Sequence, residues 1–142
     1  MKFYDRETEV KQLRDIRASV YASHSKLTVL SGRRRVGKTS LIEMAMGDEP
    51  YVYLFVGKKS EGLLCRSFCA EIAGKLGMFV PDMVEFEQVF RFLMQIEKPY
   101  TLVIDEFQNF QNINSSIFSD IQNYWDQYRK QRHINLIVGF DV

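Results

Sequence analysis

Apolar residues follow two patterns along this chain: short uninterrupted runs, and longer stretches in which they recur every three or four positions. The short runs cover residues 27–31, 51–56, 100–104 and 134–138. Continuous runs of this length predict strands that are buried on both faces. Because helical stretches separate the runs, their order predicts an α/β protein with a mostly parallel sheet flanked by helices.

The stretches between the strands have the period of amphipathic helices. A first helix is expected near residues 7–21, ahead of the first strand, and a second begins around Ser40. A third helix follows Ser60 and ends at Gly77, because glycine readily takes the left-handed conformation that closes a helix.

Two further helices are expected in the second half of the chain. Asp82 and Glu85 predict a capping box for a helix whose exit is marked by Pro99. Asn114 predicts the cap of the last helix, whose apolar stripe extends to Tyr128. The aromatic residues of both helices indicate packing against the sheet and no cofactor role.

A glycine-rich segment of the pattern G-x-x-x-x-G-K-T joins the first strand to the second helix. Its glycines allow backbone N–H groups to turn inward around an anion, and the start of the helix adds partial positive charge. Lys38 is expected to reach the β- and γ-phosphates and to assist catalysis, and Thr39 offers a hydroxyl to Mg²⁺. A plain glycine turn that caps a helix would not explain this lysine and threonine. The residues predicted to bind nucleotide are Gly32, Arg33, Arg34, Arg35, Val36, Gly37, Lys38, Thr39 and Ser40.

Two carboxylates follow the third strand directly, in the manner of a Walker B motif. Asp105 is predicted to hold Mg²⁺ together with Thr39, because ligands of open α/β sheets lie at the carboxyl ends of the strands. Glu106 is predicted to orient and polarise the attacking water. Two solvated loop residues are the alternative for such a pair. The Asp-Glu-Phe-Gln sequence, in place of Asp-x-x-Gly, favours adenine over guanine nucleotides.

Composition and charge narrow the class of protein. The 142 residues suffice for one domain, and 46% of them are apolar while 26% are charged, as in ordinary soluble proteins. No apolar run approaches the ~20 residues of a membrane span, and the charged N-terminus does not resemble a signal peptide, so a cytoplasmic location is expected. The net charge of +1 does not favour a nucleic-acid surface. Cys65 and Cys69 are expected to be small buried hydrophobic residues.

Three segments together resemble the archaeal-type prokaryotic ATPases of the AAA+ and STAND-like P-loop class. They are residues 3–9, the loop at 32–39, and 102–108 with its trailing Asp-Glu-Phe-Gln. The resemblance implies a RecA-like/AAA+ core that uses ATP and Mg²⁺. It further implies that Arg6 and Glu7 help to seat the nucleotide base, although Asp5 stands where the family signature has glycine. An ordinary charged first turn of a helix is the alternative for Arg6 and Glu7.

The chain also departs from this family. Relatives follow the fourth strand with a small polar residue that senses the γ-phosphate, whereas Gly139 and Phe140 stand here. The chain ends before the fifth strand and the helical lid of the family, so residues 1–142 are expected to be a single, incomplete ATPase core domain. Without a fifth strand, residues 27–30 are expected to lie on an open sheet edge, which predicts self-association.

Mg²⁺-dependent ATP hydrolysis is therefore the expected function. The alternative is a nucleotide-dependent binding or regulatory module with little or no turnover, and a DNA-associated motor is disfavoured by the charge. Hydrolysis at such sites often uses an arginine from a neighbouring molecule. Arg129 and Arg132 are candidates, but arginines at a helix C-terminus also act as partners of the helix dipole.

Overall fold

A computed structural model describes residues 3–32 and 37–141 of the chain. Within these residues the strands form one four-stranded sheet of order β1-β4-β3-β2, and every neighbouring pair is parallel. This confirms the predicted sheet, with small differences at the strand ends. The strands are β1 (Lys26–Gly32), β2 (Val52–Phe55), β3 (Tyr100–Asp105) and β4 (Ile134–Asp141).

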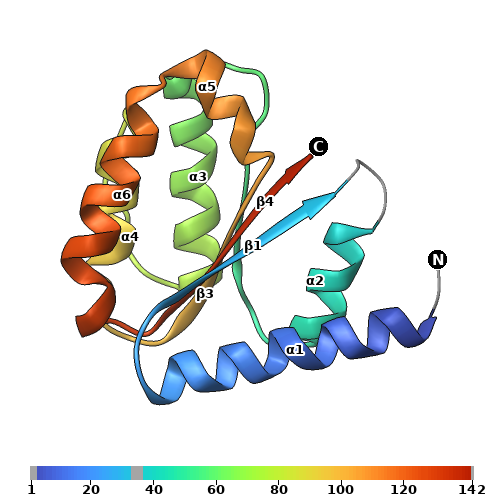
Figure 1. The fold of residues 1–142 in the computed structure, drawn as a ribbon. Helices are drawn as coiled ribbons and strands as arrows, with labels where there is room; N and C mark the ends of the chain where they lie inside the picture. Colours follow the sequence, from blue (N-terminus) through green and yellow to red (C-terminus); the bar gives the residue numbers. More distant parts are fainter. Residues whose placement is uncertain (1–2, 33–36, 142) are drawn as a thin grey trace.

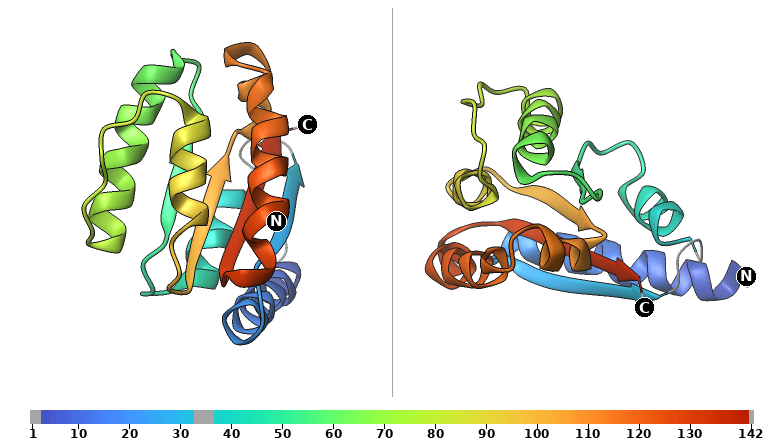
Figure 2. Two further views of the ribbon diagram at one scale, coloured as in Figure 1. Left: turned by 90° about the vertical axis from the view of Figure 1, so that its left-hand side faces the viewer. Right: turned by 90° about the horizontal axis from the view of Figure 1, so that it is seen from above.

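Helices cover both faces of this sheet (Figures 1 and 2). One face is covered by α1 (Phe3–Ala22) and α2 (Lys38–Met46). The opposite face is covered by α3 (Glu61–Leu76), α4 (Phe86–Met94), α5 (Phe110–Ile113) and α6 (Ser116–Tyr128). None of the described helices is both long and apolar enough to cross a membrane.

The two central strands explain why the apolar runs are continuous. In β3, Leu102 and Ile104 pack with α3 to α6, whereas Val103 between them packs with α1 and α2. In β4, Ile137 likewise faces α1 and α2 while its neighbours face the other layer. Each residue of a strand covered on both faces is therefore buried, whichever way its side chain points.

The ends of α3 follow the sequence closely. The Ser60 hydroxyl accepts a hydrogen bond from the Leu63 N–H group, and Gly77 closes the helix with a φ of 61°. Within α3, Cys65 is fully buried and Cys69 is half-buried, and both are free thiols. Burial raises the pKa of Cys65 to about 12, so its thiol stays neutral as an ordinary core group.

Helix α4 begins later than the predicted capping box implied. Its N-cap residue is Glu85, and the capping box is formed by Glu85 and Gln88, so the prediction of Asp82 with Glu85 was wrong. The segment around Asp82 has no regular secondary structure, and the apolar stripe that starts at Phe86 sets the beginning of the helix. Before α6, Asn114 accepts a hydrogen bond from the Ser116 N–H group at 3.2 Å, although Ser115 occupies the N-cap position.

Two arginines of α1 bind the C-terminal end of α2. Arg14 donates hydrogen bonds to the carbonyl oxygens of Ala45 (3.1 Å) and Met44 (2.8 Å), and Arg17 donates to Ala45 (3.2 Å). These carbonyl groups have no partner within the helix and carry its partial negative charge. The contacts therefore hold α1 against the helix whose other end follows the glycine-rich loop.

The two edges of the sheet differ in their protection. On the β2 edge, the Tyr53 N–H group donates to the Glu71 carboxylate at 2.9 Å, and the Lys75 ammonium donates to the Tyr51 carbonyl at 3.2 Å. Side chains of α3 thus form hydrogen bonds with backbone groups that could otherwise pair with another strand. On β1, which forms the other edge as predicted, Leu27 and Val29 remain 48% and 52% exposed.

The exposed apolar edge predicts self-association that a charge on β1 should prevent. We expect Val29→Lys to lower the average molecular mass in light scattering at high protein concentration, because an edge lysine disfavours strand pairing. Phe79→Lys serves as the matched control, since Phe79 is 85% exposed on the 77–85 segment and lies in no strand. A parent protein that stays monomeric over a wide concentration range would show that the β1 edge is protected.

Candidate nucleotide and metal site

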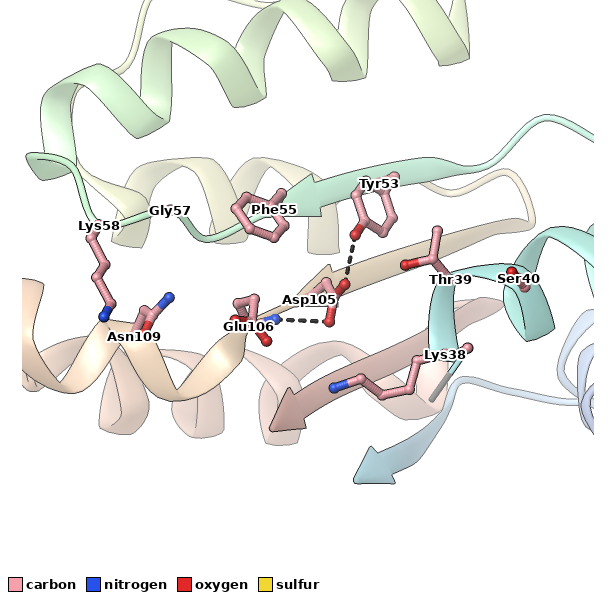
Figure 3. A pocket seen from close by; sticks show the side chains of 11 residues that line it. Lys38, Thr39, Ser40, Tyr53, Phe55, Gly57, Lys58, Asp105, Glu106 and Asn109 are labelled. Atoms are coloured by element: carbon pink, nitrogen blue, oxygen red, sulfur yellow. Dashed lines mark hydrogen bonds between the residues drawn. The ribbon is translucent and has the colours of Figure 1, made fainter. Parts of the chain in front are cut away.

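A cavity of about 650 Å³ lies at the carboxyl ends of β2 and β3, beside the start of α2. This is the end of an open parallel sheet at which ligands bind. Figure 3 shows Lys38 and Thr39 projecting from α2 toward Asp105 and Glu106, with Lys58 and Asn109 at the far end. The lining residues are Gly37, Lys38, Thr39, Ser40, Tyr53, Phe55, Gly57, Lys58, Asp105, Glu106 and Asn109.

The start of α2 supplies the anion-binding side of the cavity. Gly37 occupies the N-cap position with a φ of 87°, a left-handed conformation that favours glycine. Its carbonyl oxygen accepts the Leu41 N–H group at 2.9 Å, so the helix is regular from its first turn. The N–H groups of a helix's first turn attract anions, and Lys38 adds a positive charge. The predicted binding residues Arg33, Arg34, Arg35 and Val36 lie outside the described residues, and Gly32 ends β1.

Asp105 is the last residue of β3, and the residue is only 6% exposed. Its Oδ2 accepts a hydrogen bond from the Tyr53 hydroxyl at 2.6 Å, and its Oδ1 accepts one from the Glu106 N–H group at 2.9 Å (Figure 3). A buried carboxylate requires such partners to offset lost hydration. The two bonds hold the carboxylate in one orientation.

The donor set at this end of the cavity fits Mg²⁺. Thr39 contributes a hydroxyl and Asp105 a carboxylate, and Mg²⁺ prefers oxygen ligands. Among the described residues no group of three or more His, Cys, Asp or Glu side chains could hold a metal ion. Mg²⁺ is usually bound by one or two protein oxygens combined with phosphate oxygens and water.

Glu106 has an uncommon backbone conformation. It is the one non-glycine residue with a positive φ in the parts of the chain that the structure describes, at φ 59° and ψ 40°. A strained backbone of this kind costs about 1–3 kcal/mol and is concentrated at functional sites. The turn breaks β3 directly after Asp105 and leads into the turn at Phe107–Asn109, where the Asn109 N–H group donates to the Glu106 carbonyl at 3.0 Å. Glu106 is thereby kept in the cavity wall, 6% exposed.

Tyr53 is a residue of the site that the sequence analysis missed. Burial and the hydrogen bond to Asp105 raise the pKa of Tyr53 far above its usual range, and the nearby Thr39 hydroxyl opposes this only in part. The hydroxyl is therefore a neutral donor at ordinary pH. The sequence of residues 51–56 could have revealed this, because side chains alternate between the two faces of a strand. Val52, Leu54 and Val56 are buried on one face, which places Tyr53 on the other.

Gly139 lies within β4, next to the Asp105 carboxylate. A Cβ atom at this position would lie 2.8 Å from Asp105 Oδ1, so a side chain here would displace the carboxylate. The carboxylate thus occupies the space into which a side chain at this position would project. The next residue, Phe140, packs toward Phe107, with 6.4 Å between the ring centroids.

Some predicted residues lie away from this cavity. Glu7 is exposed on α1 and lines a separate shallow depression together with Lys11 and Arg14, and the side chain of Arg6 is outside the described part of the structure. Arg129 and Arg132 precede β4, at the opposite end of the sheet from Asp105. Arg132 donates to the Met94 carbonyl at 2.9 Å and lies over the Tyr128 ring, as expected for a structural arginine.

Comparison with known proteins supports the fold. No protein-family model matches the chain. It is 26% identical over 136 residues to the uncharacterized protein MJECL04 of Methanocaldococcus jannaschii, covering 96% of this chain and 29% of that protein.

Solved structures of a Walker-type ATPase, a Cdc6 protein and an ORC2 protein share the architecture. The Walker-type ATPase PABY2304 of Pyrococcus abyssi has a TM-score of 0.66 at 19% identity, over 95% of this chain and 44% of the other. Cdc6p of Pyrobaculum aerophilum gives 0.60 at 19% identity, covering 95% and 38% of the two chains. The ORC2 protein of Aeropyrum pernix gives 0.60 at 14% identity, covering 96% and 41%.

These likenesses concern the fold, and the chain spans less than half the length of each of the proteins compared. The chain therefore shares with these structures the α/β fold that the sequence predicts, a parallel sheet flanked by helices.

Proposed function

We propose that this chain binds ATP together with Mg²⁺ and promotes attack of water on the γ-phosphate. The proposal rests on one observation: the start of α2 and the Asp105–Glu106 pair line the same cavity. An anion-binding helix end on one side and buried carboxylates on the other suit a phosphate–metal complex. Residues 1–142 would act as one ATPase core domain in a soluble, cytoplasmic protein.

The side chains at the start of α2 bind the phosphates and the metal ion. Lys38 neutralises charge on the β- and γ-phosphates, and Thr39 and Asp105 hold Mg²⁺, which further neutralises the phosphate oxygens. Ser40 and the loop residues 32–37 surround the phosphates with N–H groups. Arg6 and Glu7 are proposed to contact the base, on the strength of the family signature alone.

Glu106 has the role of orienting the attacking water and accepting its proton. Its carboxylate lies in the wall of the cavity directly after Asp105, and the turn of its backbone keeps it there. Catalysis at such a site consists of positioning and charge neutralisation, with no covalent intermediate.

One observation favours a binding module with little turnover as the second candidate. Gly139, beside Asp105, has no side chain that could sense the γ-phosphate in the way that the resemblance leads one to expect near this end of the sheet. In that case ATP would be held without efficient hydrolysis, and the protein would act through nucleotide-dependent contacts. Steady-state phosphate release with Mg-ATP separates the two candidates. Nucleic-acid binding is not proposed, in view of the net charge of +1.

Replacing Lys38 tests the phosphate-binding side. We expect Lys38→Ala to lose ATP binding, with an affinity at least roughly 100-fold weaker, since hydrogen bonds between charged groups are among the strong ones. Titration calorimetry measures this directly. Lys58→Ala removes an equal charge from the far end of the same cavity and should retain binding. Parent-like affinity in the Lys38 variant would refute the nucleotide site.

Replacing Glu106 separates binding from hydrolysis. Glu106→Gln preserves shape but cannot accept a proton, so it should bind ATP like the parent and lose at least about 100-fold in phosphate release. Glu97→Gln, an equal change at an exposed position, should leave the rate unaltered. Equal turnover in the Glu106 variant and the parent would assign Glu106 a purely structural role.

Replacing Asp105 addresses the metal. We expect Asp105→Asn to raise the Mg²⁺ concentration required for half-maximal ATP binding by about tenfold or more, because a neutral amide is a weaker partner for the ion. Binding of ATP without metal should change little. An unchanged Mg²⁺ requirement would remove Asp105 from the proposed metal site.

A further inference from the structure

Tyr53 lies beside both residues that are proposed to hold Mg²⁺. Its hydroxyl donates to Asp105 Oδ2 at 2.6 Å, and Thr39 lines the same cavity. In Figure 3 the Tyr53 side chain points from β2 toward Asp105 at the end of β3, and Thr39 lies next to it. No other described hydroxyl is bonded to the Asp105 carboxylate.

The Asp105 carboxylate has little freedom to reorient. Oδ2 accepts the Tyr53 hydroxyl, Oδ1 accepts the Glu106 N–H group, and Oδ1 also fills the space in which a Cβ atom at Gly139 would lie. Rotation of the carboxylate would break both hydrogen bonds inside a buried site. Each oxygen can accept a further partner, because a carboxylate has about four acceptor positions. The arrangement leaves the carboxylate able to receive a metal ion or its water while its orientation stays constant.

We propose that Tyr53 is a positioning residue for Mg²⁺, holding the Asp105 carboxylate in the orientation that receives the ion beside Thr39. This inference rests on the proposed function, because it presumes that the cavity binds Mg²⁺ with a nucleotide. Residues that orient metal ligands from outside the coordination shell commonly change metal affinity by about 10- to 100-fold when they are lost.

Tyr51 offers a matched control on the same strand edge. It precedes Tyr53 by two positions, so its side chain lies on the same face, but it does not line the cavity. Its ring lies under the Lys75 ammonium, 5.4 Å from the ring centroid. Tyr51→Phe and Tyr53→Phe therefore remove the same hydroxyl group at neighbouring positions, and only the second loses a bond to Asp105.

The experiment measures nucleotide and metal binding without relying on turnover. Affinity for a fluorescent ATP analogue is determined first with EDTA and then across a Mg²⁺ titration, and Mn²⁺ binding to the nucleotide complex is followed by electron paramagnetic resonance. We expect Tyr53→Phe to keep the metal-free affinity within about twofold and to need about tenfold more Mg²⁺ or Mn²⁺. Tyr51→Phe should match the parent in all measurements.

The outcomes separate this inference from the proposed function. A parent protein that binds no nucleotide would remove both. In a second outcome, the parent protein binds nucleotide with metal, and the Tyr53→Phe variant binds the metal equally well or more tightly. This result would overturn the positioning role of Tyr53 and leave the proposed function standing. Equal losses of metal-free and metal-dependent binding, accompanied by a lower melting temperature, would show that the hydroxyl merely supports the fold, and would also overturn it.

Discussion

The site depends on a buried carboxylate at the end of a central strand. Asp105 is removed from water, where an unpaired charge is costly, and is retained because a tyrosine hydroxyl and a backbone N–H group bind its two oxygens. These partners come from β2 and from the residue after β3, while Gly139 of β4 provides the space. Three adjacent strands therefore determine where the carboxylate lies. The left-handed turn at Glu106 belongs to the same arrangement, because its N–H group is one of the two donors.

The opposite wall of the cavity depends on how α2 is held. Arg14 and Arg17 bind carbonyl groups at its C-terminal end, and its first turn borders the cavity. Since both ends belong to one nine-residue helix, contacts with α1 also set the direction from which Lys38 and Thr39 approach Asp105. The residues that stabilise the fold and those that form the site are thus connected through one short rigid element.

The elements that sequence analysis predicted well are those with local causes. The four apolar runs became the four strands of the described sheet, and Ser60 and Gly77 lie at the two ends of α3. The capping box of α4 was misplaced because Asp82 and Glu85 have the required spacing, whereas burial of Phe86 sets the actual start. The short helical segment 107–113 was missed, since so few residues show no period.

By itself, the sequence determined the glycine-rich loop with Lys38 and Thr39, the Asp105–Glu106 pair, and the order of strands and helices, because these features consist of neighbouring residues. Only the tertiary structure decided that Tyr53 bonds to Asp105 and that a Cβ atom at Gly139 would meet the Asp105 carboxylate, since these residues come from separate strands. The order β1-β4-β3-β2 sets which strands are neighbours and leaves β1 at an edge. Contacts across a sheet depend on that order, and spacing along the chain does not encode the distance between two strands.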